Sequence, residues 1–291
     1  MWLLALLALA DTTQVFVLGV SPAESLEVTV VRGPAVAREA PVVLIPGLFG
    51  SAFAYRGVIP KLTAAGYRVI VIEPLGVGSS ARPERADYSL TAQADRIATA
   101  LDQLGVVGAI VVAHAVGASI AYRLAYRRPE LVRGIVALEG GPAEAAATPG
   151  FRRAMRLAPW VKLFGGARLI RNKIRAYLIA ASGDTTWVSE AVMDGYTAGA
   201  ARDLDGTLKA YIRMARSRER ERLRSHLGEI RCPVRLIIGG APHDGAPPPE
   251  EVALLAAALP AFAVDTVTGA GHFLYEERPQ AVVAAVLEAA P

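Results

Sequence analysis

The chain has 291 residues, of which 53% are hydrophobic and 20% are charged, with a formal net charge of +4. This length and apolar content suit one large domain with an insertion. The basic residues do not form one long run, which argues against a nucleic-acid or anionic-membrane partner. The single cysteine, Cys232, excludes an internal disulfide, and no Cys/His spacing is typical of a zinc site. We therefore expect neither a metal nor a cofactor.

An apolar run at residues 2–10 begins the chain and ends in Ala-Leu-Ala, a pattern that a signal peptidase could cleave. The run lacks a positively charged start and is short for a signal segment. Two alternatives stay open: an exported protein, or a cytoplasmic one whose apolar N-terminus packs on the domain. No stretch of about 18 apolar residues occurs, so we expect no transmembrane helix.

Short runs rich in Val and Ile alternate with helix-like stretches, which is typical of β-α units on a parallel sheet. Residues 14–20 and 25–31 are interpreted as an initial hairpin. Further candidate strands follow at 41–47, 67–74, 107–114, 132–140, 234–240 and 262–269. The pattern predicts an α/β fold with an eight-stranded, mostly parallel sheet that has helices on both faces.

The alternation stops between residues 142 and 230, where Arg-rich helical patterns follow one another. We interpret 142–230 as a mainly helical cap inserted into a core formed by residues 1–141 and 231–291. Its alternating charges at 217–224 predict a solvated helix face. Four of its aromatic residues are candidates to line a pocket: Trp160, Trp187, Tyr196 and Tyr211.

Residues 113–117, Ala-His-Ala-Val-Gly, follow a predicted strand and precede a predicted helix. Their spacing matches the G-x-S-x-G turn of serine hydrolases, with Ala115 at the position of the serine. Such a turn lifts the nucleophile above the sheet and directs the next backbone N–H, here that of Val116, at an oxyanion. Ala113 stands at the position of the first glycine, and the hydroxyl of the nucleophile is missing.

Two other loops occur in the order that this chemistry needs. The loop at residues 46–50, Pro-Gly-Leu-Phe-Gly, is expected to supply the second oxyanion donor, the N–H of Leu48. The glycine-rich loop at 269–273 carries His272 after the last predicted strand, where a general base is needed. His272 is therefore the predicted base.

Together these motifs resemble the α/β-hydrolase superfamily, in particular its cap-bearing esterases, lactonases, non-haem haloperoxidases and meta-cleavage-product hydrolases. The likeness includes IPGLFGSAFAYRGVIPKL, EPLGVGSSARP, YRRPELVRGIVALEG and HFLYEERPQAV. It implies the fold but does not select among the family's reactions. Two positions depart from the family pattern: Pro46 replaces a histidine common before the loop glycine, and Ala115 replaces the nucleophile.

The resemblance implies a carboxylate that orients His272, and two residues fit. Asp244 follows the 234–240 strand, where the family's usual acid lies, whereas Glu139 ends the 132–140 strand, where haloalkane dehalogenases place theirs. Either could stabilise the protonated imidazole, and we favour Asp244. His243 and His114 are interpreted as structural neighbours rather than a metal pair. The candidate substrate contacts are Phe49, His114, Trp160, Trp187 and Phe273.

A methyl group cannot attack a carbonyl, and we interpret the nearby Ser51 and Ser119 as structural. Three hypotheses follow. The first is a hydrolase of a carboxylic ester or related acyl compound, inactive because alanine replaces its serine. The second is a non-catalytic protein that binds a small apolar ligand or a partner. The third is a lyase or cofactor-free dioxygenase that abstracts a proton with His272. We favour the first, with a hydrophobic small-molecule substrate; the sequence specifies neither that substrate nor the oligomeric state.

Overall fold

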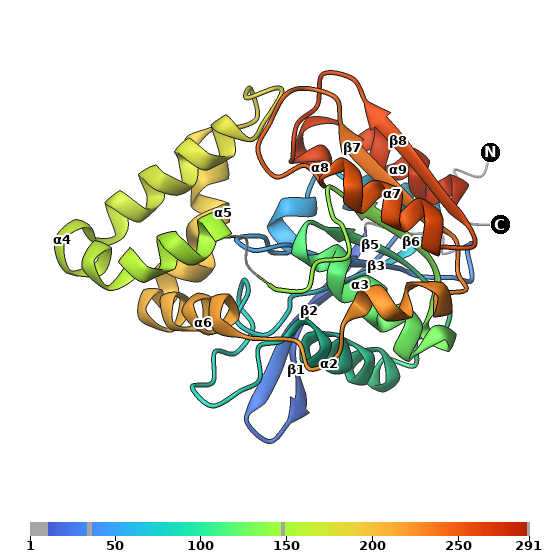
Figure 1. Cartoon of the computed structure of the whole chain (residues 1–291), viewed down its shortest axis with the longest axis horizontal. Helices are drawn as coiled ribbons and strands as arrows, with labels where there is room; N and C mark the ends of the chain where they lie inside the picture. The colour runs from blue at the N-terminus through green and yellow to red at the C-terminus, as the bar shows by residue number, and fades with distance from the viewer. Residues whose placement is uncertain (1–10, 34–36, 147–148, 290–291) are drawn as a thin grey trace, which may run out of the picture.

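A computed structural model of the chain describes residues 11–33, 37–146 and 149–289 (Figure 1). The described side chains exclude those of residues 149–151, 154 and 156–167. All the predicted strands are confirmed: β1 (Thr12–Ser21), β2 (Glu24–Arg32), β3 (Val42–Ile45), β4 (Arg68–Ile72), β5 (Ala109–His114), β6 (Val132–Leu138), β7 (Val234–Gly239) and β8 (Phe262–Val267).

These strands form one eight-stranded sheet in the order β1-β2-β4-β3-β5-β6-β7-β8. The hairpin of β1 and β2 is antiparallel, and β2 also runs antiparallel to β4. From β4 onward all neighbours are parallel. The predicted α/β fold with a mostly parallel sheet is therefore confirmed. Because the order places β6, β7 and β8 side by side, the loops that follow them emerge at one edge of the sheet.

Side chains that alternate along the central strands fill two cores. Val43 and Val111 belong to the core beneath α2 (Leu90–Gln103) and α3 (Val116–Arg127). Val42 and Val112 belong to the opposite core, beneath α1 (Ile59–Ala64) and α9 (Pro279–Glu288). A strand covered on both faces must be apolar at nearly every position, which explains the unbroken Val/Ile runs of the sequence. The remaining short elements are η1 (Ala52–Tyr55), η2 (Pro129–Leu131), α7 (Pro249–Ala258) and α8 (Leu274–Glu277).

Between β6 and β7 the chain forms α4 (Pro149–Ala180), α5 (Glu190–Arg202), α6 (Leu204–Arg216) and η3 (Leu223–Glu229). Figure 1 shows α4, α5 and α6 grouped to one side of the sheet. We propose that they form the cap expected within residues 142–230. None of the helices among the described residues combines the length and hydrophobicity that crossing a bilayer requires.

The charge run at 217–224 does not form the solvated helix face that we predicted, because α6 ends at Arg216. Its acidic residue Glu219 has a side chain only 3% exposed, 3.6 Å from the guanidinium of Arg123. The Glu219 carboxylate also accepts hydrogen bonds from the first N–H groups of α2, those of Leu90 and Thr91. These partners lie far away in the sequence, so the local charge pattern does not reveal them.

Candidate active site

Ala115 lies in a sharp turn between β5 and α3, with φ 50° and ψ −117°. Residues with a side chain rarely adopt this conformation, and it persists only where the surroundings fix it. The Ala115 N–H donates to the Leu138 carbonyl, and the Ala118 N–H donates to the Ala115 carbonyl. The neighbours must be small: a Cβ on Gly117 would lie 2.8 Å from a backbone oxygen, and one on Gly140 would lie 2.3 Å from the Ala118 Cβ. Tight packing therefore holds position 115 in this turn.

The N–H groups of Leu48 and Val116 belong to residues that line the same cavity as Ala115. Val116 begins α3, where the first N–H groups have no intrahelical acceptor and carry the positive end of the helix dipole. Leu48 precedes Phe49, whose N–H donates to the Tyr211 hydroxyl at 3.1 Å. Among the backbone hydrogen bonds of the described turns and loops, neither the Leu48 nor the Val116 N–H donates one. Both groups can therefore serve a negatively charged oxygen.

His272 is 5% exposed and lies in the loop between β8 and α8. Its N–H donates to the Ala181 carbonyl at 2.8 Å, and its own carbonyl lies 3.0 Å from His114 Nε2. Since a carbonyl only accepts, His114 carries its proton on Nε2. Burial, together with the nearby His272, holds the pKa of His114 well below its usual value. A neutral His114 thus ties the His272 loop to the end of β5.

Glu277 is a buried carboxylate beneath the same loop. Its Oε2 accepts hydrogen bonds from the N–H groups of Gly271 at 2.9 Å, Gly183 at 2.8 Å and Asp184 at 2.8 Å. These bonds join the His272 loop to the segment that follows α4. Sequence reasoning missed this role, because a pair of glutamates near a helix end is typical of solvent-facing positions.

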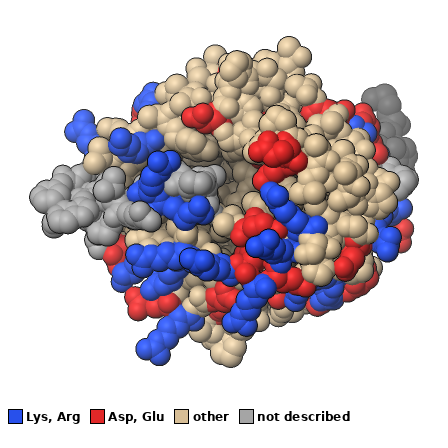
Figure 2. Space-filling view, in the orientation of Figure 1, with Lys and Arg blue, Asp and Glu red and all other residues tan. Residues whose placement is uncertain are grey.

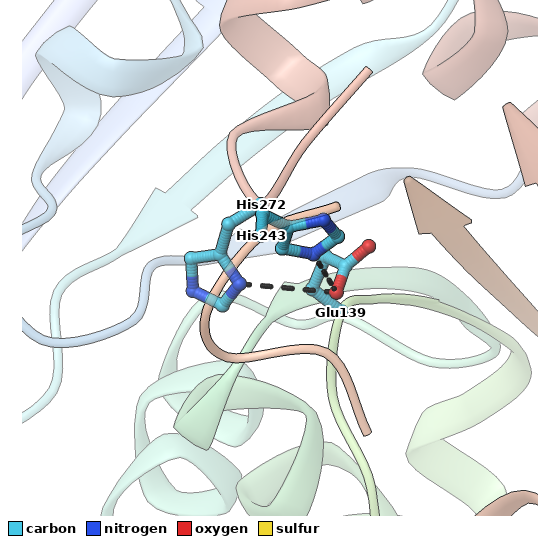
Figure 3. Close-up of side chains that lie close together, drawn as sticks. All are labelled: Glu139, His243 and His272. Carbon is cyan, nitrogen blue, oxygen red and sulfur yellow. Dashed lines mark hydrogen bonds and ion pairs between the residues drawn. The ribbon is translucent and has the colours of Figure 1, made fainter. Parts of the chain in front are cut away.

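Glu139 is the candidate acid that lies near His272. It follows β6 with φ 53°, and its side chain is fully buried. Its Oε2 lies 3.8 Å from His272 Nδ1 and 3.0 Å from His243 Nε2 (Figure 3). Its Oε1 accepts the N–H of Gly239. One carboxylate oxygen therefore faces two imidazole rings.

Asp244, the acid that we favoured from the sequence, is exposed in the loop after β7 and lines the cavity. Among the described residues, the acid paired with His272 within 4.0 Å is Glu139, not Asp244. The next residue approaches the ring more closely, since a Cβ on Gly245 would lie 3.0 Å from His272 Nδ1. The β7 loop therefore turns His243 inward and leaves Asp244 in solvent.

A cavity of about 1540 Å³ opens above Ala115 and extends to α4, α5 and α6. Figure 2 shows this side of the molecule hollowed, with charged side chains of both signs around the opening. The predicted contacts Phe49, His114 and Phe273 line the cavity, as do three tyrosines: Tyr177, Tyr196 and Tyr211. Its volume exceeds the roughly 300–1,000 Å³ that is usual for a small-molecule site.

Trp187, which we predicted as a substrate contact, is not among these lining residues. Trp187 packs behind Phe273, with ring centroids 5.4 Å apart, and its Nε1 lies 3.3 Å from the Ser182 hydroxyl. The Trp187 ring therefore supports Phe273 rather than forming the cavity wall. The side chain of Trp160 lies outside the described residues.

Comparison with known proteins decides the family. A family model described as "Alpha/beta hydrolase family" matches residues 42–286. The chain belongs to the α/β-hydrolase family. It is 27% identical over 241 residues to the uncharacterized hydrolase YugF of Bacillus subtilis, covering 83% of this chain and 86% of YugF.

Solved structures also match almost the whole chain. Cfl2 from Burkholderia cenocepacia is 26% identical, with a TM-score of 0.73 and 95% of each chain covered. A thermophilic esterase from Thermogutta terrifontis is 21% identical, with a TM-score of 0.72, and the match covers 94% of this chain and 97% of the esterase. At such an identity the second likeness shows the fold alone.

The hydroxyl nearest the turn in the sequence of this α/β hydrolase, that of Ser119, is already engaged. Its Oγ donates to the Gly141 carbonyl at 2.6 Å and accepts the Ala143 N–H at 3.0 Å. These bonds fix the chain after β6 against α3. The contacts support the structural role that we expected for Ser119, because its hydroxyl is occupied by two backbone partners.

Proposed function

We propose that this α/β hydrolase binds a hydrophobic carboxylic ester or related acyl compound, and that Ala115 leaves it unable to turn that compound over. The observation that carries the proposal is the strained turn at Ala115, which shares one cavity with His272, Leu48 and Val116. A strained backbone is usually kept where function requires it. The mostly aromatic and aliphatic lining favours an apolar ligand.

Each residue has a defined role if a serine occupies position 115. The serine oxygen attacks the ester carbonyl and His272 takes its proton, then returns that proton to the departing alcohol. Glu139 stabilises the imidazolium, an assignment supported by its burial and its 3.8 Å separation from His272 Nδ1. The Leu48 and Val116 N–H groups stabilise the negatively charged tetrahedral oxygen.

The test is to introduce the missing oxygen. Ala115→Ser and the matched variant Ala115→Gly are compared with the unmodified chain on p-nitrophenyl esters of short and long acyl chains. We expect Ala115→Ser to exceed both by at least about a thousandfold in turnover, because loss of a triad nucleophile costs about a millionfold. Adding His272→Ala should abolish the gain. A folded Ala115→Ser protein with background turnover on every ester rejects the proposal.

A non-catalytic ligand-binding protein is the second candidate, and one observation favours it. The 3.8 Å between Glu139 and His272 Nδ1 is longer than a hydrogen bond, so the base is not yet coupled to its acid. If Ala115→Ser stays inactive while the unmodified chain binds apolar acyl compounds, this candidate replaces the first. Activity of the unmodified chain that His272→Ala removes would instead support proton abstraction by His272.

A further inference from the structure

Three ligand atoms from the loops after β6, β7 and β8 converge at one point: Glu139 Oε2, His243 Nε2 and His272 Nδ1 (Figure 3). They all lie within 4.8 Å of one another. The three side chains are 0%, 2% and 6% exposed, respectively. We propose that these residues, called here the Glu139 cluster, bind a divalent transition-metal ion with the coordination preferences of Zn²⁺.

The hydrogen bonding of His243 calls for a cation beside it. Its Nδ1 lies 2.7 Å from the Ala241 carbonyl, which can only accept, so Nδ1 carries a proton. A neutral His243 then directs the lone pair of Nε2 at Glu139 Oε2, 3.0 Å away. Two acceptors at this distance need a proton or a metal ion between them; the proton would be shared by His243 and Glu139.

His272 distinguishes the metal from the proton. Its Nδ1 is buried and has no hydrogen-bond partner in the described part of the chain. A proton shared by His243 and Glu139 leaves that nitrogen unsatisfied, at a cost of about 1–3 kcal/mol. A metal ion between the three atoms would engage all of them once the His272 ring moves toward it. The orphaned nitrogen therefore favours a ligand that can make three bonds.

The donor set and its surroundings match a zinc site. Two imidazoles and one carboxylate bind Zn²⁺ at about 2.0–2.2 Å and leave a fourth position open. The Glu139–His243 distance of 3.0 Å suits two such ligands, and the 3.8 Å to His272 requires a small movement of that ring. The Ala241 carbonyl on His243 and the Gly239 N–H on Glu139 are the outer hydrogen bonds that orient metal ligands.

The inference does not depend on the proposed function, because no ligand involves residue 115. If both hold, a metal ion on His272 Nδ1 also occupies the oxygen of Glu139 that the base needs. Zn²⁺ should then inhibit Ala115→Ser, and a chelator should restore its turnover. Zinc binding by a chain whose Ala115→Ser variant is inactive would support this inference and reject only the proposed function.

The experiment uses the chelator-treated full chain carrying Cys232→Ser, which removes the one thiol. Zn²⁺ binding is measured by calorimetry, and Co²⁺ binding by its visible absorption. We expect one ion per chain, with affinity reduced at least about tenfold in His243→Phe and Glu139→Gln. His226→Phe is the matched control, since His226 pairs with Glu221 and Glu229 outside the cluster and should bind normally.

Circular dichroism establishes that each variant is folded. If Glu139→Gln does not fold, the test is the Zn²⁺ affinity of His243→Phe compared with that of the chain with the unmodified cluster. Zn²⁺ should also raise the Tm of the Cys232→Ser chain, since an ion that binds only the folded state stabilises it. Absence of Zn²⁺ binding at millimolar metal, or equal affinity in His243→Phe, overturns the inference and assigns the positive charge to a proton.

Discussion

Arg123, on α3, has a guanidinium only 1% exposed between two carboxylates. It lies 3.3 Å from Glu144 and 3.6 Å from Glu219. It also donates to the carbonyls of Ser119 at 3.1 Å and Ala143 at 3.0 Å. One buried cation therefore connects the helix after the Ala115 turn to two separate segments of the region between β6 and β7.

Replacing this cation should destabilise the fold strongly. Arg123→Met keeps much of the side-chain volume but leaves the Glu219 carboxylate buried without a positive partner. Removing one member of a buried ion pair costs about 3–5 kcal/mol. At about 2–3 °C per kcal/mol for a chain of this size, the Tm should fall by roughly 6–15 °C.

The assay is thermal and urea unfolding of the purified variant. The matched control is Arg127→Met on the same helix, whose partner Asp95 lies 2.8 Å away but where both side chains are at least 33% exposed. An exposed pair contributes about 0–1 kcal/mol. Equal losses in the two variants, or a loss below about 1 kcal/mol for Arg123→Met, would refute the reasoning. Adding Glu219→Gln should recover part of the stability lost in Arg123→Met.

Three further predictions concern the loops around the cavity. Burial raises the pKa of Glu73 from 4.5 to about 7, so the folded state holds the extra proton and this group's contribution to stability falls as pH rises from 4.5 to 7. The decrease is at most about 3 kcal/mol. Glu73→Gln should remove this pH dependence, measured as the difference between the urea unfolding midpoints at pH 5 and pH 8. An unchanged difference in Glu73→Gln would exclude Glu73 as its cause. Glu277→Ala leaves four N–H groups without their acceptor, so we expect a loss of at least about 2 kcal/mol and faster hydrogen exchange at Gly271, whereas unchanged exchange would contradict that role. Gly140→Ala should lower the free energy of unfolding by about 1–3 kcal/mol, because its Cβ would lie 2.5 Å from the Ala115 carbonyl oxygen. The control Gly19→Ala, whose Cβ would have nothing within 4 Å, should unfold like the unmodified chain. Equal unfolding midpoints for the two variants would show that the turn tolerates the methyl group.

The sheet could be predicted from the sequence because each strand is marked by its own residues rather than by distant contacts. Most residues of the strands from β3 to β6 are buried, so a short run of Val, Ile, Leu or Ala marks each of them. The turn at Ala115 could also be predicted from the sequence, because its geometry requires small residues at set positions around residue 115. Both features are consequences of steric requirements that neighbouring residues satisfy.

The carboxylate that lies near His272 could not be predicted in the same way. Glu139 and Asp244 each follow a strand of the sheet, and the resemblance to the family favoured Asp244. The difference arises because the β7 loop turns His243 toward Glu139 and places Asp244 in solvent, a path set by contacts 104 residues apart. The buried roles of Glu277 and Arg123 likewise depend on distant partners, and no local pattern distinguishes them from surface charges.

The most direct measurement is covalent labelling with a fluorophosphonate, followed by intact mass and peptide mapping. A serine activated by His272 displaces fluoride and keeps the phosphonyl group. We expect Ala115→Ser to take up one group at residue 115, the unmodified chain to take up none, and the added His272→Ala change to slow labelling at least about a hundredfold. If the serine introduced by Ala115→Ser stays unlabelled in a folded chain, or reacts equally fast without His272, that result contradicts the assignment of this turn as a nucleophile site.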